Sequence, residues 1–482
     1  MNIIMTNKIV LTRIIISVYS LTSIYIILQL FFNKANVNIN LSLLLLTSAT
    51  FIPLLMKIRS KNNVEIFEPI YGYTFIFYMF YILGSLIVYN TSVFDTSRKP
   101  LNVYNESQIC PILISLSAGI SLFHLGYFLN SYNTKKTEIT LRNDIFKFNP
   151  IISFLYLISI SFRIYGYSTG QLGSLAAISG ASINIPFASI FYFISNIWFV
   201  YFAYYSACHF YYKKFSLFFY FALLFEIVIV LISGDRRYIV EVFLIAFGFY
   251  YDKTKYIPWK KVFIVLVLFL FVFWPIVTVY GQLLEATNDF GAAVNQFDLV
   301  LSLLQTTSIT ELLDNILNST VSSLFFLSDC QTAYVNFDLE GTNWGPVGLQ
   351  NLLNNLVPSS FISRLDVRQY YDIFAVYSLG RSVDYSWLTF MSAPEAIISF
   401  GLFFMPLVFF VRGYFSSSIF KYLYTKNSFS KVMYYALFFT LIYSFHCGLL
   451  TSELVTPLRV YIYYRIIVFL LNARKPGKAV SI

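Results

Sequence analysis

Long apolar segments, each close to the length of a membrane-spanning helix, follow one another along almost the whole chain. A helix needs about 20 mainly apolar residues to cross the hydrocarbon core of a bilayer. Charged residues make up only 12% of the 482 residues, whereas about 25% is usual in a soluble domain. So few charges could not cover a water-soluble surface, and the sequence therefore predicts an all-α, multi-pass membrane protein.

A hydropathy window of about 19 residues divides the chain into about twelve predicted spans. The first nine lie in residues 1–280, and the last three lie in residues 396–482 together with a short tail. Residues 281–395 form a long, largely polar segment in which apolar residues recur at helical spacing, so we expect a large helical loop there. The predicted spans are Ile9–Phe32, Ile39–Met56, Ile70–Tyr89, Ile109–Leu129, Ile151–Tyr165, Phe187–Tyr211, Phe215–Ile232, Ile239–Tyr251, Val262–Tyr280, Ala396–Tyr414, Val432–Leu449 and Leu458–Leu471.

Basic residues are concentrated in every second loop between the predicted spans. Short loops rich in Lys and Arg stay in the cytoplasm. We therefore expect both termini in the cytoplasm and residues 281–395 on the outer side of the membrane. The net charge of +10 is spread over the short inner loops, so it does not indicate binding to nucleic acid.

Four arginines at the outer ends of predicted spans are candidate functional residues. Arg163 lies near the end of the fifth span, Arg236 and Arg237 occupy the turn after the seventh, and Arg459 opens the twelfth. An arginine at membrane depth is unfavourable without a partner or a function. Its planar guanidinium matches phosphate oxygens in a bidentate manner. Because the four share one predicted depth, we expect them to line one cavity that binds a pyrophosphate.

Structural roles are the alternative for each of these residues. Arg163 and Arg459 could reach lipid headgroups from the ends of their spans. Arg236 and Arg237 could pair with the neighbouring Asp235 or cap the turn. Other buried polar groups also call for a partner: Glu226 and Glu241 could pair with polar groups inside the helix bundle, and His124 is interpreted as a buried, hydrogen-bonded histidine.

Several short motifs occur in a defined order along the chain. The run Leu231–Tyr238, Leu-Ile-Ser-Gly-Asp-Arg-Arg-Tyr, precedes an aromatic apolar span, and the motifs that follow it lie at Gly341–Gly345, Leu356–Pro358, Ser392–Ala396 and Phe400–Gly401. In this order and spacing they resemble the motifs of bacterial O-antigen polymerases, the oligosaccharide repeat unit (Wzy-type) polymerase family. The likeness covers the topology and about half of the chain. The stretch around Pro358 lacks the Pro-Arg of some members.

The resemblance implies a GT-C-like membrane glycosyltransferase architecture in the bacterial cytoplasmic (inner) membrane. Such enzymes transfer a growing glycan, for example the O-antigen of lipopolysaccharide, from one polyprenyl-pyrophosphate carrier to another lipid-linked repeat unit on the outer face. Polyprenyl-pyrophosphate-linked oligosaccharide and membrane lipid are the implied partners, and a chain-length regulator protein and a flippase are further candidates. No cofactor is implied.

The same resemblance suggests roles for individual residues. Arg163, Arg236, Arg237 and Arg459 would stabilise the charge on the leaving pyrophosphate. Glu395 is the first choice for the base that accepts the proton of the acceptor hydroxyl, although it could equally be a helix-start charge favoured by the dipole. Further candidates for the base are Asp235, Asp366, Asp384 and His446. The candidate substrate-binding residues are Asp235, Arg364, Arg368, Arg381 and His446.

Other interpretations stay open at the level of sequence. The first outer loop has no acidic residue, so we expect no metal site. An O-antigen ligase would commonly carry a histidine in the long outer segment, which has none between Gly281 and Pro394. A lipid-linked oligosaccharide flippase or transporter would lack a long ordered outer loop. A disulfide among the predicted outer cysteines Cys110, Cys330 and Cys447 is also open.

Overall fold

The computed structural model describes residues 2–33, 38–60, 65–86, 106–131, 150–169, 198–213, 216–233, 236–273, 275–277, 280, 326–335, 392–426, 428–447, 462 and 465. Regular secondary structure in these ranges is helical throughout, without a strand. The chain divides into two compact units. Unit 1 comprises Met1–Thr137, Thr320–Thr425 and Leu441–Val455, and unit 2 comprises Glu138–Ser319, Lys426–Thr440 and Thr456–Ile482.

Described helices coincide with all or part of the first eleven predicted spans. They are α1 (Asn2–Asn33), α2 (Ile39–Ser60), α3 (Pro69–Ile76) with the π-helix η1 (Phe77–Leu83), α5 (Glu106–Ser131), α6 (Pro150–Ser168), α9 (Trp198–Tyr212), α10 (Ser216–Ser233), α11 (Arg236–Thr254), α12 (Trp259–Leu268) with the π-helix η2 (Phe269–Phe273), α20 (Ser392–Lys426) and α21 (Ser428–Cys447). The twelfth predicted span lies outside the described residues except for Ile462 and Arg465.

Five of the described helical segments are long and apolar enough to cross a membrane: Ile39–Ile58, Pro69–Leu86, Ser107–Asn130, Trp259–Val277 and Ser392–Tyr424. Large apolar side chains are also exposed on several helices, for example Leu44 of α2, Leu217 of α10 and Phe263 of α12. Such a surface would be unfavourable in water but matches lipid chains. An all-α membrane protein is therefore confirmed, and the number of twelve spans stays a prediction.

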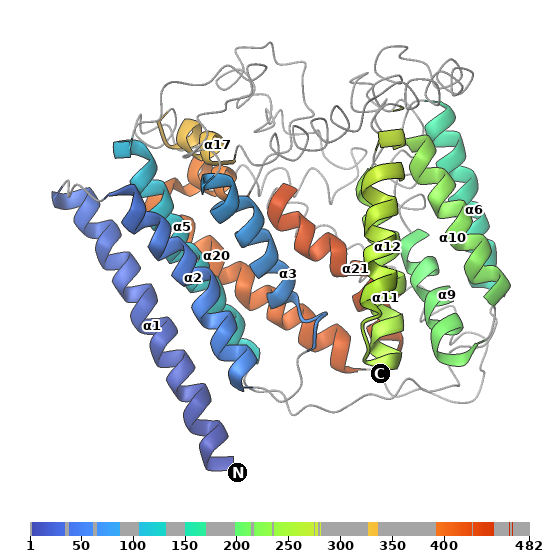
Figure 1. The fold of residues 1–482 in the computed structure, drawn as a ribbon, viewed down its shortest axis with the longest axis horizontal. Coiled ribbons are helices and arrows are strands. Elements are labelled where there is room, and N and C mark those ends of the chain that lie inside the picture. Colours follow the sequence, from blue (N-terminus) through green and yellow to red (C-terminus); the bar gives the residue numbers. More distant parts are fainter. Residues whose placement is uncertain are drawn as a thin grey trace. The chain divides into compact units, whose positions relative to one another are not determined.

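Unit 1 is built around α5, which lies beside α1 and α2 (Figure 1). Most of its side chains are buried, and Leu116 and Phe123 pack in one apolar core with Phe77 of η1 and with Leu402 and Phe409 of α20. A helix that is apolar on all sides is buried by its neighbours on all sides. Helix α5 is therefore the central helix of this unit.

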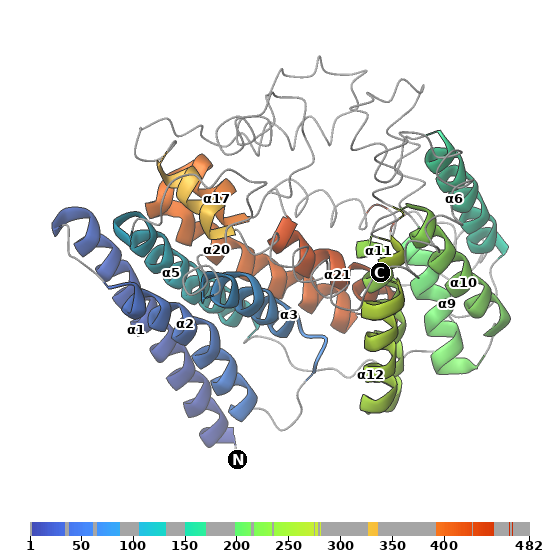
Figure 2. The same cartoon turned by 45° about the horizontal axis from the view of Figure 1, so that its top comes forward.

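Helices α5 and α20 run in the same direction and approach closely (Figure 2). Ser115 Oγ in the first half of α5 donates to the Leu402 carbonyl at 2.6 Å, and Asn130 Nδ2 near the end of α5 donates to the Tyr414 carbonyl at 3.2 Å. A Cβ atom added at Gly126 would lie 2.3 Å from the Phe410 carbonyl oxygen. Small residues at such a crossing let two membrane helices pack backbone to backbone.

Helix α20 is longer than the predicted span and is bent. It begins at Ser392 and ends at Lys426, and Gly401 interrupts it with φ 77° and ψ 164°. This positive φ is easily reached only by glycine. The helix therefore begins with a separate short piece, Ser392–Phe400, which is almost entirely buried.

One helix of the long polar segment is described, α17 (Phe326–Ala333). Its Leu327 and Cys330 join the core of unit 1, and Gln331 Nε2 donates to Gln108 Oε1 of α5 at 2.7 Å. The polar segment thus contributes a helix at the end of unit 1 where α5 begins. Cys110 and Cys330 are both buried and form no disulfide with each other, so that open pairing is excluded.

The opposite end of unit 1 is held by a buried ion pair. Lys57 near the end of α2 pairs with Glu68, the residue before α3. Tyr127 near the end of α5 donates to Glu68 Oε1 at 3.1 Å, and its ring lies 4.9 Å from Lys57 Nζ. The ends of α2 and α5 and the start of α3 therefore meet at one place, as expected when successive helices alternate in direction.

Unit 2 contains α6, α9, α10, α11, α12 with η2, and the beginning of α21. Helices α9 and α11 run in the same direction, because Trp198 contacts Tyr238 at their starts and Phe210 contacts Tyr250 near their ends. Helix α21 is antiparallel to α11 (Figure 1): Thr440 contacts Glu241, Tyr435 contacts Phe249, and Lys431 contacts Asp252. Both relations agree with the predicted order of alternating spans.

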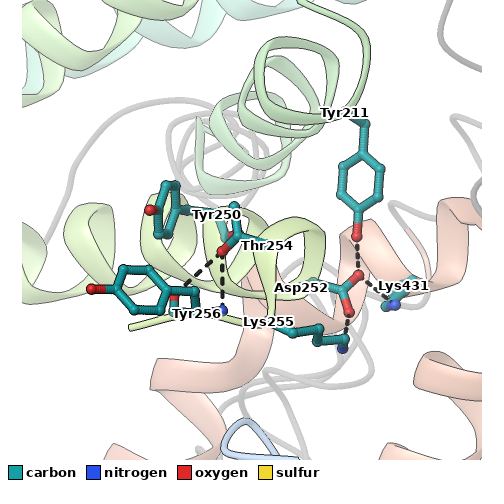
Figure 3. Close-up of polar contacts among 7 residues, drawn as sticks. All are labelled: Tyr211, Tyr250, Asp252, Thr254, Lys255, Tyr256 and Lys431. Carbon is teal, nitrogen blue, oxygen red and sulfur yellow. Dashed lines mark hydrogen bonds and ion pairs between the residues drawn. The ribbon is translucent and has the colours of Figure 1, made fainter. Parts of the chain in front are cut away.

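Asp252, near the end of α11, is the centre of a polar cluster in unit 2 (Figure 3). Its carboxylate lies 2.5 Å from Lys431 Nζ and 2.9 Å from Lys255 Nζ, and it accepts a hydrogen bond from Tyr211 OH. Burial alone would raise the pKa of Asp252, but the two ammonium groups and the tyrosine hydroxyl outweigh it and lower the pKa. The cluster thus joins the ends of α9 and α11 to the start of α21.

Candidate functional site

A buried ion pair connects α6 to α10 in unit 2. Arg163 Nη1 donates to Glu226 Oε2 at 2.6 Å, and the two side chains are 2% and 0% exposed. Tyr156 OH donates to the other carboxylate oxygen, Oε1, at 2.8 Å. Both oxygens of Glu226 therefore have a donor, which is what a buried carboxylate requires.

The helical repeat explains why these side chains face the interior. Tyr156 and Arg163 are about two turns apart and so share one face of α6. A different face of α6 carries the exposed apolar residues Phe154, Leu157 and Ile164. Arg163 therefore points into the protein and does not reach toward lipid headgroups, which removes that alternative for this residue.

Trp198 links this ion pair to the start of α11. Its ring centroid lies 4.9 Å from Cζ of Arg163, and the ring also makes an edge contact with Tyr238 at 5.8 Å. Trp198 is itself buried, at 2% exposed. We use the name Arg163 cluster for Tyr156, Arg163, Trp198 and Glu226. This cluster therefore borders the first turn of α11.

Helix α11 begins at Arg236, three residues before the predicted span that opens at Ile239, so the two arginines that we expected in the turn belong to the helix. Arg236 and Arg237 lie in its first turn, two residues and one residue before Tyr238. Their main chain is described, whereas their side chains are not. The structure thus places Arg163 and Tyr238, the residue after Arg237, against the same tryptophan.

Glu395 lies in the first turn of α20 in unit 1 and is 1% exposed. An acidic side chain in this position is favoured by the helix dipole. Its nearly complete burial separates it from an ordinary solvent-exposed helix-start charge. The motif Ser392–Ala396 opens α20 as expected, and Phe400-Gly401 marks the bend that ends the first helical piece.

The remaining predicted residues divide into those with a described environment and those without one. Glu241 Oε1 accepts a hydrogen bond from Thr440 Oγ1 at 3.2 Å. Glu226 and Glu241 thus each pair with a polar side chain inside the bundle, as expected. His446 lies in α21, but its side chain is not described. The predicted residues outside the described ranges are Asp235, Arg364, Arg368, Arg381, Arg459, Asp366 and Asp384.

His124 differs from its prediction. It is fully buried on α5, but neither ring nitrogen has a hydrogen-bond partner within the described ranges. Its neighbours are aromatic: Phe77 at 6.3 Å, Phe123 at 5.8 Å and Phe128 at 6.4 Å between ring centroids. The predicted burial of His124 is therefore confirmed, whereas the predicted hydrogen bond is wrong within the described ranges.

Tyr156 and Trp198 are the members of the Arg163 cluster that sequence reasoning missed. Tyr156 could have been found from its spacing, since it shares a helix face with Arg163. No local pattern distinguishes Trp198 from the other aromatic residues of its span. Within the same described ranges, no group of three or more His, Cys, Asp or Glu residues is placed to hold a metal ion.

The helices and the buried charges define the class of this protein: an all-α membrane protein with an arginine held inside a helix bundle. No family model, no curated protein and no solved structure matches the chain.

Proposed function

We propose that this protein is an oligosaccharide repeat unit polymerase that acts at the outer face of the bacterial cytoplasmic membrane. One observation carries the proposal. Trp198 contacts both the buried Arg163 and the first turn of α11, where the Arg236–Arg237 motif begins. A group of arginines beside one apolar wall suits a lipid-linked pyrophosphate, which has an anionic head and a hydrocarbon chain.

The proposed reaction transfers a glycosyl group. The bond between the anomeric carbon of the donor glycan and its pyrophosphate oxygen breaks, and the lipid pyrophosphate leaves with the electron pair. The acceptor hydroxyl oxygen forms a bond to the anomeric carbon, and its proton passes to a base, for which Glu395 is the first candidate. Preorganised cations stabilise the charge that develops on the leaving oxygen.

In this proposal the charges have separate tasks. Arg163, Arg236, Arg237 and Arg459 act on the pyrophosphate, as fixed donors that need no reorganisation during the reaction. Asp235, Arg364, Arg368, Arg381 and His446 are the candidates for contacts to the glycan. In the same proposal both termini lie in the cytoplasm and residues 281–395 lie outside, as the distribution of Lys and Arg among the loops predicts.

A deletion strain tests the proposal. Cells that lack the protein should still export single lipid-linked repeat units, so the surface glycan would carry one unit in place of a ladder of lengths. Purified protein in lipid nanodiscs should in turn extend a lipid-linked repeat unit into a ladder without any other protein. A full ladder in the deletion strain would exclude this function, and loss of even the single unit would favour a ligase or a flippase.

A further inference from the structure

The two terminal nitrogens of the Arg163 guanidinium differ in their hydrogen bonding. Nη1 is bonded to Glu226, while Nη2 is fully buried and has no hydrogen-bond partner in the described part of the chain. A buried N–H donor of a charged group is rarely left without an acceptor, because the loss of its hydration is not compensated. An acceptor from outside the protein would explain the unused donor.

We propose that Glu226 is a positioning residue that holds Arg163 by Nη1 and so leaves Nη2 for a phosphate oxygen of the lipid-linked pyrophosphate. This inference rests on the proposed function and assigns a role to a carboxylate that does not itself touch the substrate. Glu226 acts through its hydrogen bond to Arg163, which would otherwise be free to rotate about its side-chain bonds.

Two contacts restrain the guanidinium plane. The carboxylate binds at its edge, 2.6 Å from Nη1, and the Trp198 ring lies 4.9 Å from Cζ. The contact with an aromatic ring is favourable for a guanidinium and limits its tilt. An arginine that is held in this way loses little entropy when a ligand binds, since its side chain is already ordered.

Tyr156 restrains Glu226 in turn. Its hydroxyl donates to Oε1 at 2.8 Å, and it lies on the same helix as Arg163. Two residues of α6 therefore hold the Glu226 carboxylate of α10, and each is hydrogen-bonded to a different oxygen. Rotation of the carboxylate would break one of the two bonds, so the position of Arg163 is determined by the packing of α6 against α10.

The charge balance explains why positioning matters here. Arg163 and Glu226 together carry no net charge, so the pair offers a directed N–H donor and little excess positive potential. A fixed donor stabilises developing charge because it does not have to reorient. The phosphate group of an ordinary phospholipid offers the same oxygens, and the two sources of phosphate must therefore be separated by experiment.

Turnover of purified full-length protein in nanodiscs tests the inference, with a lipid-linked repeat unit as substrate and rates given per folded molecule. Glu226→Gln should lower kcat by about 100-fold, the effect of losing one oriented donor, and leave KM within about twofold, because the donor acts on charge that develops in the transition state. Tyr156→Phe should lower kcat about fivefold, as expected for the loss of one hydrogen bond.

Two controls separate positioning from folding. The double variant Arg163→Met/Glu226→Leu removes both charges, and a buried pair replaced in this way usually keeps the fold. It should remain folded and be inactive. Asp252→Asn breaks a second buried ion pair of unit 2 and should lower the melting temperature while kcat per folded molecule stays unchanged.

The possible results separate the positioning role of Glu226, the identity of the phosphate ligand and the polymerase function. Unchanged kcat in Glu226→Gln, or turnover by the folded double variant, would overturn the positioning role and leave the polymerase function in place. If Glu226→Gln loses a bound phospholipid in native mass spectrometry but keeps its kcat, Nη2 binds a headgroup and the assignment to the carrier is wrong. Wild-type protein that does not extend the substrate would overturn the proposed function, and this inference with it.

Discussion

Gly413 of α20 lies against the main chain of Phe123 of α5, so close that an added Cβ atom would be 2.0 Å from the Phe123 carbonyl oxygen. The obstructing atom belongs to a backbone that is buried in the middle of unit 1, and it cannot move aside as a flexible side chain would. This contact holds two parallel helices together, and one of them begins with the buried Glu395. The close approach of α5 and α20 therefore depends on the missing side chain at position 413.

Gly413→Ala should lower the free energy of unfolding by about 1–3 kcal/mol or more, the usual effect of overpacking a core. Thermal unfolding in detergent, followed by loss of the monodisperse peak in size-exclusion chromatography, measures the change. Gly119→Ala is the matched control on α5, because its nearest neighbours are ring atoms of Phe409 at 3.2 Å and beyond. Equal melting temperatures for the two variants would contradict the close crossing.

Asp252 should make stability depend on pH. Its folded pKa lies below the ordinary value of 3.8, because Lys431, Lys255 and Tyr211 outweigh the effect of burial. A lowered folded pKa contributes stability that is fully present above the unfolded pKa and is lost as pH falls through the folded value. The stability difference between the wild type and Asp252→Asn should therefore be constant near neutral pH and shrink below about pH 4. A difference that stays the same down to pH 3 would show that the ionised carboxylate adds nothing.

Arg236→Lys should impair turnover more than it lowers the amount of folded protein. Lysine keeps the positive charge but loses the planar fork of donors that matches phosphate. The length distribution of the surface glycan, compared with the protein level in the membrane, separates the two effects. Arg465→Lys, at an exposed position, is the control and should leave both unchanged. A normal glycan ladder with Arg236→Lys would reduce Arg236 to a helix-start residue.

Glu395→Gln should give single repeat units in place of a ladder if Glu395 is the base. The amide keeps the shape of the side chain but cannot accept the acceptor proton. Gel analysis of surface glycan from a complemented deletion strain measures the outcome, with protein level determined in parallel. A normal ladder with this variant would leave Glu395 only the role of a charge at the start of α20.

Cysteine labelling tests the orientation in the membrane. A cysteine introduced at Asn343 should react with an impermeant thiol reagent added from outside, and one at Lys136 should not. The native background is low, because Cys110, Cys208 and Cys330 are buried, and Cys447 can be replaced by serine. Reaction of both introduced cysteines from the same side would show that the predicted alternation of inner and outer loops is wrong.

Local features of the sequence were sufficient to predict the described helices of the first eleven spans, whereas α17 was expected only in general terms, as part of a helical loop. A run of apolar residues must form a helix in lipid, since every backbone N–H and C=O has to be bonded within the segment. The predicted spans that begin at Ile239 and Ala396 correspond to α11 and α20, although these helices begin three and four residues earlier, at Arg236 and Ser392. Arg163 stood out by itself, because a charge at membrane depth needs a partner or a function.

The partners of these residues were decided by tertiary structure. Glu226 is 63 residues from Arg163, and nothing local indicated that α6 would place the arginine on that carboxylate and not on lipid. Trp198 was one aromatic residue among many until the contact between α9 and α11 placed it between Arg163 and Tyr238. Apolar periodicity reports which face of a helix is buried, whereas the identity of the neighbour depends on how whole helices pack, and that information is spread over the entire chain.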